Sequence, residues 1–254
     1  IDTWGLLFYR GAIPFVVVLI ALILFYKKNF LNTFKIIGVV GIFYAISFTI
    51  CNITFIVSIQ NTNVANTLIM VAMAPMLSAF LGALFLNEIP DKKTWIAITI
   101  TFFSVIFIFY DSIQLGNILG DMFGFITALG LAVSANLARY AKSRDLVPAA
   151  VLGKLGTAIF AFLFVKNFDL LANDIIIVPL MCVMCVAIPF VLVTIAPRFI
   201  TAAEVNLFFL LEVVLGPIWV WLVISEKPSL ETLYGGIVII FTITIHSILA
   251  LKKT

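Results

Sequence analysis

The sequence contains few charged residues, a single histidine and only three cysteines. Of its 254 residues, 11% are Asp, Glu, Lys or Arg, whereas a soluble domain carries about 25%. So few charges cannot cover a water-facing surface, which excludes a soluble globular domain, a disordered chain and a nucleic-acid-binding module. The cysteines, Cys51, Cys182 and Cys185, all lie in apolar stretches. They exclude a disulfide framework and predict buried structural thiols.

The sequence is instead rich in long apolar runs. Hydrophobic residues make up 64% of the chain, and the mean hydropathy is +1.25. A helix that crosses a bilayer needs about 20 mostly apolar residues. Apolar runs between charged or turn-rich breaks predict nine spans, at 5–26, 36–59, 65–86, 94–110, 118–138, 149–165, 175–197, 202–223 and 232–251. The alternation typical of a membrane barrel is absent, so we expect an all-α polytopic membrane protein.

The distribution of cations predicts the orientation of these spans. Alternate connections hold eleven of the fifteen Lys and Arg residues: Lys27, Lys28, Lys35, Lys92, Lys93, Arg139, Lys142, Arg144, Arg198, Lys252 and Lys253. The other connections hold only Lys166 and Lys227. Because positively charged loops stay in the cytoplasm, we expect a multi-pass inner-membrane protein with a cytoplasmic C-terminus.

An internal repeat relates the two halves of the chain. A shift of 138 residues aligns Glu88-Ile89-Pro90 with Glu226-Lys227-Pro228 and superposes the spans on either side. The second half then has five spans and the first has four. We therefore expect two inverted five-helix repeats, 1–116 and 117–254, with the first helix of the N-terminal repeat absent from this sequence. A protein with nine helices is the alternative.

The end of each repeat carries a motif with regular spacing. The first half reads Ala74-Pro75 through Asn87-Glu88, and the second reads Glu212-Val213 through Ser225-Glu226. This element resembles that of the drug/metabolite transporter superfamily, EamA type, in which Glu-Pro precedes a Glu by thirteen residues. Each half keeps one member of the dipeptide, Pro75 or Glu212. Tyr9-Arg10-Gly11 is similar to the family's Arg early in its second helix.

The resemblance implies a secondary transporter of ten helices in two inverted bundles. Its solute would lie in a central cavity lined by the first four helices of each half. Relatives move amino acids, nucleotide sugars, cofactors, vitamins and other small metabolites, most often outward in bacteria. The resemblance does not identify the substrate.

Polar residues within the spans are the candidates for solute binding or proton coupling. A charge near the bilayer centre costs at least about 2.5–3.5 kcal/mol and usually faces a cavity or a partner. Glu212 lies in the middle of its span and is expected to exchange a proton or contact a cationic group of the solute. Its alternative role is that of a structural, protonated carboxyl. Asn136 and Asn52 are further cavity candidates, and Trp221 either caps the solute or belongs to the interfacial aromatic belt.

Three further charges are candidates for a gate. Lys154 and Glu204 lie at similar depth near the cytoplasmic side, so we expect them to form an ion pair that opens during transport, or to extend separately to the membrane surface. Arg10, at comparable depth on the outer side, is a candidate for carboxylate capture or for the same kind of extension. His246 is expected to be structural.

Prolines within the spans are expected to act as hinges, chiefly Pro75 and Pro217. We expect a transporter of a small polar metabolite such as an amino acid, exporting by alternating access with proton coupling; the alternatives are a non-transporting membrane subunit or an intramembrane enzyme. Motifs of intramembrane or hydrolytic enzymes are missing, so no enzyme activity, metal or cofactor is expected. The expected partners are the solute, membrane lipid and a second copy of the chain in a homodimer, with no nucleic acid.

Overall fold

The computed structural model describes the chain except for residues 1, 63, 109–117, 171–173, 226–229 and 252–254. Within the described part the secondary structure is helical, and nine helical spans follow one another along the chain. They are α1 (Thr3–Tyr26), α3 (Gly38–Asn61), α4 to η2 (Val64–Leu86), α6 (Lys92–Ile108), α7 (Ile118–Tyr140), α8 (Val147–Phe162), α9 to η5 (Asp174–Arg198), α11 (Ala202–Ile224) and α12 (Leu230–Leu251). Each predicted boundary lies within three residues of the observed one, so the all-α prediction is confirmed.

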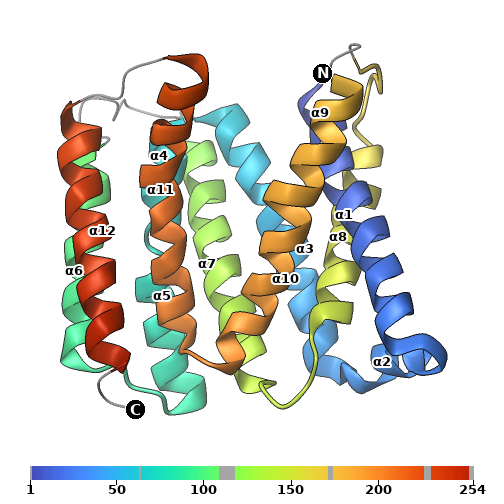
Figure 1. Cartoon of the computed structure of the whole chain (residues 1–254), viewed down its shortest axis with the longest axis horizontal. Coiled ribbons are helices and arrows are strands. Elements are labelled where there is room, and N and C mark those ends of the chain that lie inside the picture. Colours follow the sequence, from blue (N-terminus) through green and yellow to red (C-terminus); the bar gives the residue numbers. More distant parts are fainter. Residues whose placement is uncertain (1, 63, 109–117, 171–173, 226–229, 252–254) are drawn as a thin grey trace. The chain divides into compact units, whose positions relative to one another are not determined.

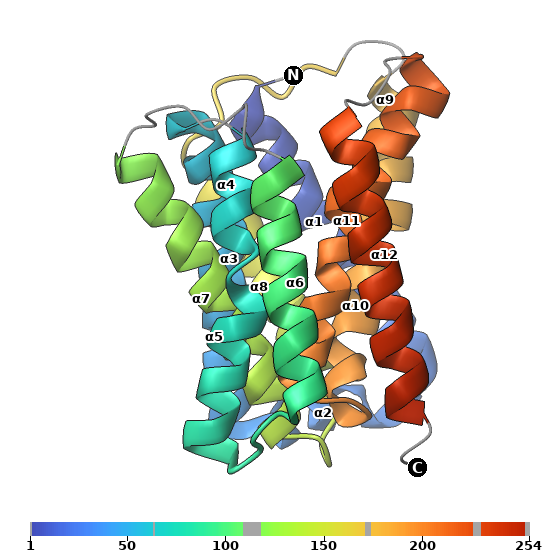
Figure 2. The ribbon, with the colours of Figure 1, turned by 90° about the vertical axis from the view of Figure 1, so that its left-hand side faces the viewer.

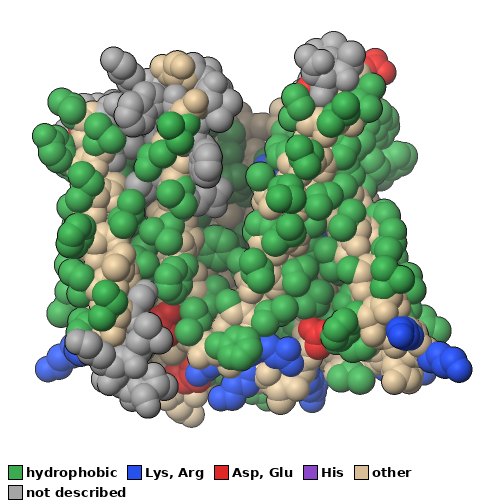
Figure 3. All heavy atoms as spheres, in the orientation of Figure 1, with side chains coloured by type: hydrophobic (Ala, Val, Ile, Leu, Met, Phe, Trp, Pro, Cys, Tyr) green, Lys and Arg blue, Asp and Glu red, His purple; other side chains and the backbone are tan. Residues whose placement is uncertain are grey.

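The composition of these helices matches a bilayer. Five helical stretches, Thr3–Ile36, Gly38–Asn61, Asn66–Leu86, Ile118–Tyr140 and Asp174–Arg198, are long and apolar enough to cross a membrane. Shorter apolar helices occupy Val147–Phe162, Ala202–Leu211 and Leu233–His246. In each part of the molecule, hydrophobic side chains line the visible helices and Lys and Arg side chains gather at the lower end (Figure 3). The short helix α2 (Phe30–Ile36) follows α1 at that end.

Two of the spans are interrupted. The third consists of α4 (Val64–Val71), α5 (Ala74–Leu81) and a π-helical turn, η2 (Gly82–Leu86). Pro75 lies at the start of α5, where its missing N–H removes a backbone hydrogen bond and favours the break at residues 72–73. The predicted hinge residue thus lies at a break in its helix, while hinge motion stays a prediction.

The seventh span has the same kind of interruption. It consists of α9 (Asp174–Met181), the π-helical turn η4 (Cys182–Ala187), α10 (Ile188–Ile195) and the short 3₁₀ turn η5 (Ala196–Arg198). π-helical turns within α-helices occur frequently at functional sites. The prediction that every cysteine is buried is wrong for Cys185, which is exposed, whereas Cys51 and Cys182 are buried. The widened turn rotates Cys185 out of the packed face that Cys182 occupies.

The helices form two compact units. Unit 1 comprises 1–56 and 133–200, and unit 2 comprises 57–132 and 201–254. Each unit therefore contains helices from both halves of the sequence. The division into repeats at residue 116 remains a prediction alongside this packing.

Unit 1 is organised around α1 and α8, which lie side by side over most of their length (Figure 1). Gly11 of α1 allows this approach, because a Cβ there would lie 2.8 Å from the backbone nitrogen of Ala158. The core between them is apolar and aromatic and includes Val18, Tyr44 and Phe48.

In unit 2, α12 packs along α6 (Figure 1), α11 packs on α12 (Figure 2), and α5 packs on α11. Ser78, Ala79 and Gly82 form a stripe of small residues on α5 and η2 that is buried in this packing. The stripe therefore serves close helix contact within the chain.

Candidate functional site

The most deeply buried charge among the described residues is Lys154, in the middle of α8. Its side chain is 3% exposed. Its Nζ donates a hydrogen bond to Oδ1 of Asn52 on α3 at 2.9 Å. The Asn52 amide in turn donates to the carbonyl of Phe48, one helical turn away, at 2.6 Å. Two predicted site residues are thus in direct contact.

Two glycines of α8 allow this contact. Gly153 and Gly156 have no side chains on the surface of α8 that faces α3. A Cβ on Gly153 would lie 3.1 Å from the carbonyl oxygen of Ala45. Thr49 uses the space, since its hydroxyl donates to the carbonyl of Gly153 at 2.9 Å. The close approach of the two backbones brings Lys154 within reach of the Asn52 amide.

Aromatic rings complete the surroundings of the ammonium group. Its Nζ lies 5.1 Å from the ring centroid of Phe48 and 5.5 Å from that of Phe190 on α10. Cation–π contacts of this kind are worth about 2 kcal/mol or more when desolvated. Tyr44 stacks on Phe48 with centroids 5.8 Å apart, and its hydroxyl shares a 2.9 Å hydrogen bond with Thr194. The rings are therefore held in place by their own neighbours.

Arg10 lies on α1, next to Gly11, and its side chain is half-buried. Its positive charge repels that of Lys154, and both cations interact electrostatically with the thiol of Cys182 in η4. The structure thus brings three of the predicted residues, Arg10, Asn52 and Lys154, into one region of unit 1. We call these three residues, together with Phe48 and Phe190, the Lys154 site.

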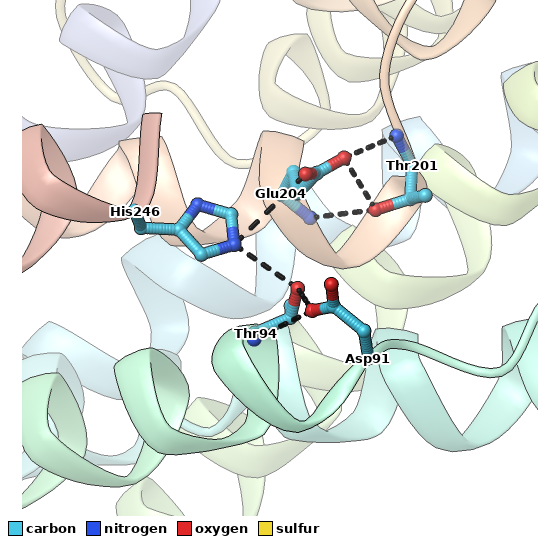
Figure 4. Close-up of polar contacts among 5 residues, drawn as sticks. All are labelled: Asp91, Thr94, Thr201, Glu204 and His246. Carbon is cyan, nitrogen blue, oxygen red and sulfur yellow. Dashed lines mark hydrogen bonds and ion pairs between the residues drawn. The ribbon is translucent and has the colours of Figure 1, made fainter. Parts of the chain in front are cut away.

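A second polar cluster lies in unit 2, at the start of α11 and the end of α12 (Figure 4). Glu204 forms a capping box with Thr201, whose backbone N–H and hydroxyl both donate to Oε2 at 2.8 Å. Nε2 of His246 lies 4.0 Å from Oε1 of Glu204 and 3.0 Å from the hydroxyl of Thr94. Thr94 also binds Asp91, which caps α6.

Through these contacts, Glu204 and His246 stabilise the ends of helices. His246 is 7% exposed and connects the first turns of α6 and α11, in keeping with its predicted structural role. Glu204 and Lys154 belong to different units and each has the partners just described. The ion pair predicted between them stays a prediction.

The remaining predicted residues divide into two groups. Asn136 is buried on α7, 7% exposed. The helix α11 includes Glu212, Pro217 and Trp221, but their side chains lie outside the described residues. Across the described ranges, His, Cys, Asp and Glu form no group of three that could hold a metal ion.

Neither phenylalanine of the Lys154 site is among the residues predicted from the sequence. Phe48 carries a signal, because Tyr44, Phe48 and Asn52 are spaced four residues apart and so share one helix face. Phe190 has a different signal in the sequence, since the 138-residue shift aligns it with Asn52. Equivalent positions of the two proposed repeats therefore contact the same lysine.

Comparisons with known proteins agree with this fold. No curated protein matches the chain, but 26 chains of solved structures do. One of these, a crystal structure, superposes with a TM-score of 0.84 at 14% identity, covering 98% of this chain and 89% of its own. That likeness shows a shared fold. The model of the EamA-like transporter family matches residues 1–110 and again residues 118–248. Since these two matches, one for each repeat, span almost the whole sequence, the chain belongs to the EamA-like transporter family.

Proposed function

We propose that this protein is a secondary transporter that exports a small polar metabolite, such as an amino acid, across the inner membrane. Family membership supports transport as the general activity. The observation that carries the proposal is a charged side chain, Lys154, buried among apolar helices with an amide and two aromatic rings around it. A buried charge is expensive in a membrane protein and usually marks a solute or ion pathway.

Alternating access is the mechanism we propose. Lys154 is 3% exposed, so a solute reaches it only when the surrounding helices separate. The break before Pro75 and the π-helical turns η2 and η4 interrupt backbone hydrogen bonding, which lowers the cost of bending there. We propose Pro75 and Pro217 as hinges and Lys154, Glu204 and Arg10 as gating charges.

Proton coupling and solute contact extend the proposal to further polar residues within the predicted spans. We propose that Glu212 carries the coupled proton and that Asn52, Asn136 and Trp221 contact the solute. The cation distribution supports a cytoplasmic C-terminus. We propose in addition that two copies of the chain form a homodimer.

A counterflow assay tests the proposal. Purified protein is placed in liposomes loaded with one unlabelled metabolite, and uptake of the same labelled metabolite from outside is followed for a panel of amino acids, organic acids, sugars and phosphate esters. The proposal predicts accumulation of at least one labelled solute above that in protein-free liposomes. No accumulation of any solute by folded protein would contradict it and favour a non-transporting subunit.

A further inference from the structure

The Lys154 site contains two cations and no compensating acid among the described residues. The ammonium of Lys154 has a neutral hydrogen-bond partner, Oδ1 of Asn52, and neutral rings beside it. The groups that act on it electrostatically are Arg10 and the thiols of Cys51 and Cys182. Of these, Arg10 is a basic side chain like Lys154, and its charge has the same sign. The site therefore brings two basic side chains together without an acidic partner among the described residues.

A positive site of this kind is incompletely stabilised. Buried charges in proteins are normally paired with an opposite charge, because a neutral environment repays only part of the lost hydration. Arg10 adds repulsion to this cost. An anionic group placed near both cations would remove the repulsion and supply the missing counter-charge.

The hydrogen-bonding capacity of the site also fits an anion. An ammonium group has three N–H donors, and within the described residues one of the three on Lys154 is used, by Asn52. The two remaining donors and the guanidinium of Arg10 are the groups that bind carboxylates and phosphates in proteins. The ring of Phe190 lies beside the ammonium, and the buried residues of η4 are Cys182, Val186 and Ala187, so the surroundings of the two cations are otherwise apolar.

We propose that Arg10 and Lys154 bind an anionic oxygen group, carboxylate or phosphate, of the transported solute. This inference rests on the proposed transport function and names the chemical class of its substrate. Asn52 holds the ammonium in place between solutes, and the π-helical turn η4 lies beside the site on the same span as Phe190.

The test uses direct binding to the purified full chain, measured by isothermal titration calorimetry, with solutes paired to differ only in the anionic group. L-alanine is compared with L-alaninamide, succinate with succinamide, and glycerol 3-phosphate with glycerol. A carboxylate or a phosphate solute should bind, and its partner without the anionic group should bind at least about tenfold more weakly. The first two pairs against the third tell a carboxylate site from a phosphate site.

Variants of the two cations complete the test. Lys154→Gln and Arg10→Gln should each weaken binding of the anionic solute about tenfold or more, Lys154→Arg should retain part of the affinity, and the exposed Lys166→Gln should bind like the wild type. Thermal melting of each variant confirms folding. Binding of no anionic solute, equal binding of both members of every pair, or unchanged binding by folded Lys154→Gln would overturn the inference.

Counterflow of the same solutes separates this inference from the proposed function. Anion binding that depends on Lys154 without counterflow would leave the site standing and contradict transport. Counterflow of neutral solutes that is unchanged in Lys154→Gln would support transport and overturn the anion site.

Discussion

Removal of the buried cation should cost transport far more than stability. The perturbation is Lys154→Met combined with Asn52→Leu, which replaces the hydrogen-bonded pair by apolar side chains of similar size. If Lys154 served only the fold, the double variant would lose stability and transport together. In a solute site the charge is retained for function, and the fold gains little from it.

The magnitude follows from the contacts of Lys154. Burial of one ammonium costs several kcal/mol. Its charged hydrogen bond to Asn52 returns about 1.5–3 kcal/mol, and each of its two ring contacts returns about 2 kcal/mol. These contacts offset most of the cost of burial, to which the repulsion by Arg10 adds, so the double variant should change the free energy of unfolding by less than about 2 kcal/mol. Lys154→Met alone leaves Oδ1 of Asn52 without its donor and should cost about 1–3 kcal/mol.

The assay has two readouts on the same preparations. Unfolding in detergent micelles is followed by tryptophan fluorescence, and counterflow is measured with the solute found by screening. The double variant should unfold like the wild type and lose transport at least about tenfold. Lys166→Met, in the exposed loop after α8, is the matched control and should change neither. Destabilisation of the double variant by more than about 3 kcal/mol, or full transport by it, would refute the reasoning.

Three further changes test the helix contacts that hold each unit together. Gly11→Ala pushes a methyl group against the Ala158 backbone; it should lower the free energy of unfolding by about 1–3 kcal/mol and reduce counterflow, and unchanged stability would refute the close approach of α1 and α8. Thr201→Ala removes the cap of α11 and should cost about 0.5–2 kcal/mol in the same unfolding assay, whereas Thr201→Ser should cost much less. His246→Leu leaves the Thr94 hydroxyl without this partner and should cost about 0.5–1.5 kcal/mol; a variant more stable than the wild type would contradict this bond.

The helices could be predicted from the sequence because each is a continuous apolar run between polar breaks. Lys92-Lys93 and Ser143-Arg144-Asp145 cannot lie in the bilayer, so the spans end beside them. The interruptions were only partly predictable. Pro75 explains the break before α5, and Pro189 at the start of α10 removes the backbone hydrogen bond to the carbonyl of Cys185 in η4. The widening of these breaks into π-helical turns is not visible in the periodicity.

The Lys154 site was predictable in its charges and not in its contacts. Lys154, Arg10 and Asn52 stand out because polar residues are rare in these spans. Their meeting depends on contacts between residues far apart in the chain, such as Lys154 and Asn52, which are separated by 102 positions. Phe48 and Phe190 are two of 25 phenylalanines, and composition does not distinguish a ring beside a cation from one beside lipid. The contact of Glu204 with Thr201 could be predicted, because the two residues have the spacing of a capping box. The similar depth of Glu204 and Lys154 in the membrane led instead to the prediction of an ion pair between them.

Access to the Lys154 site from both faces of the membrane tests alternating access most directly. Asn52→Cys is introduced into a chain whose three native cysteines are replaced by alanine, and a membrane-impermeant thiol reagent is added to either side of proteoliposomes. Asn52 is half-buried and lies against the buried Lys154, so in a protein that opens to one side only, the reagent would reach the new thiol from that side alone. We predict labelling from both sides and slower labelling in the presence of saturating transported solute. Labelling from one side only, at a rate that the solute does not change, would contradict transport through this site.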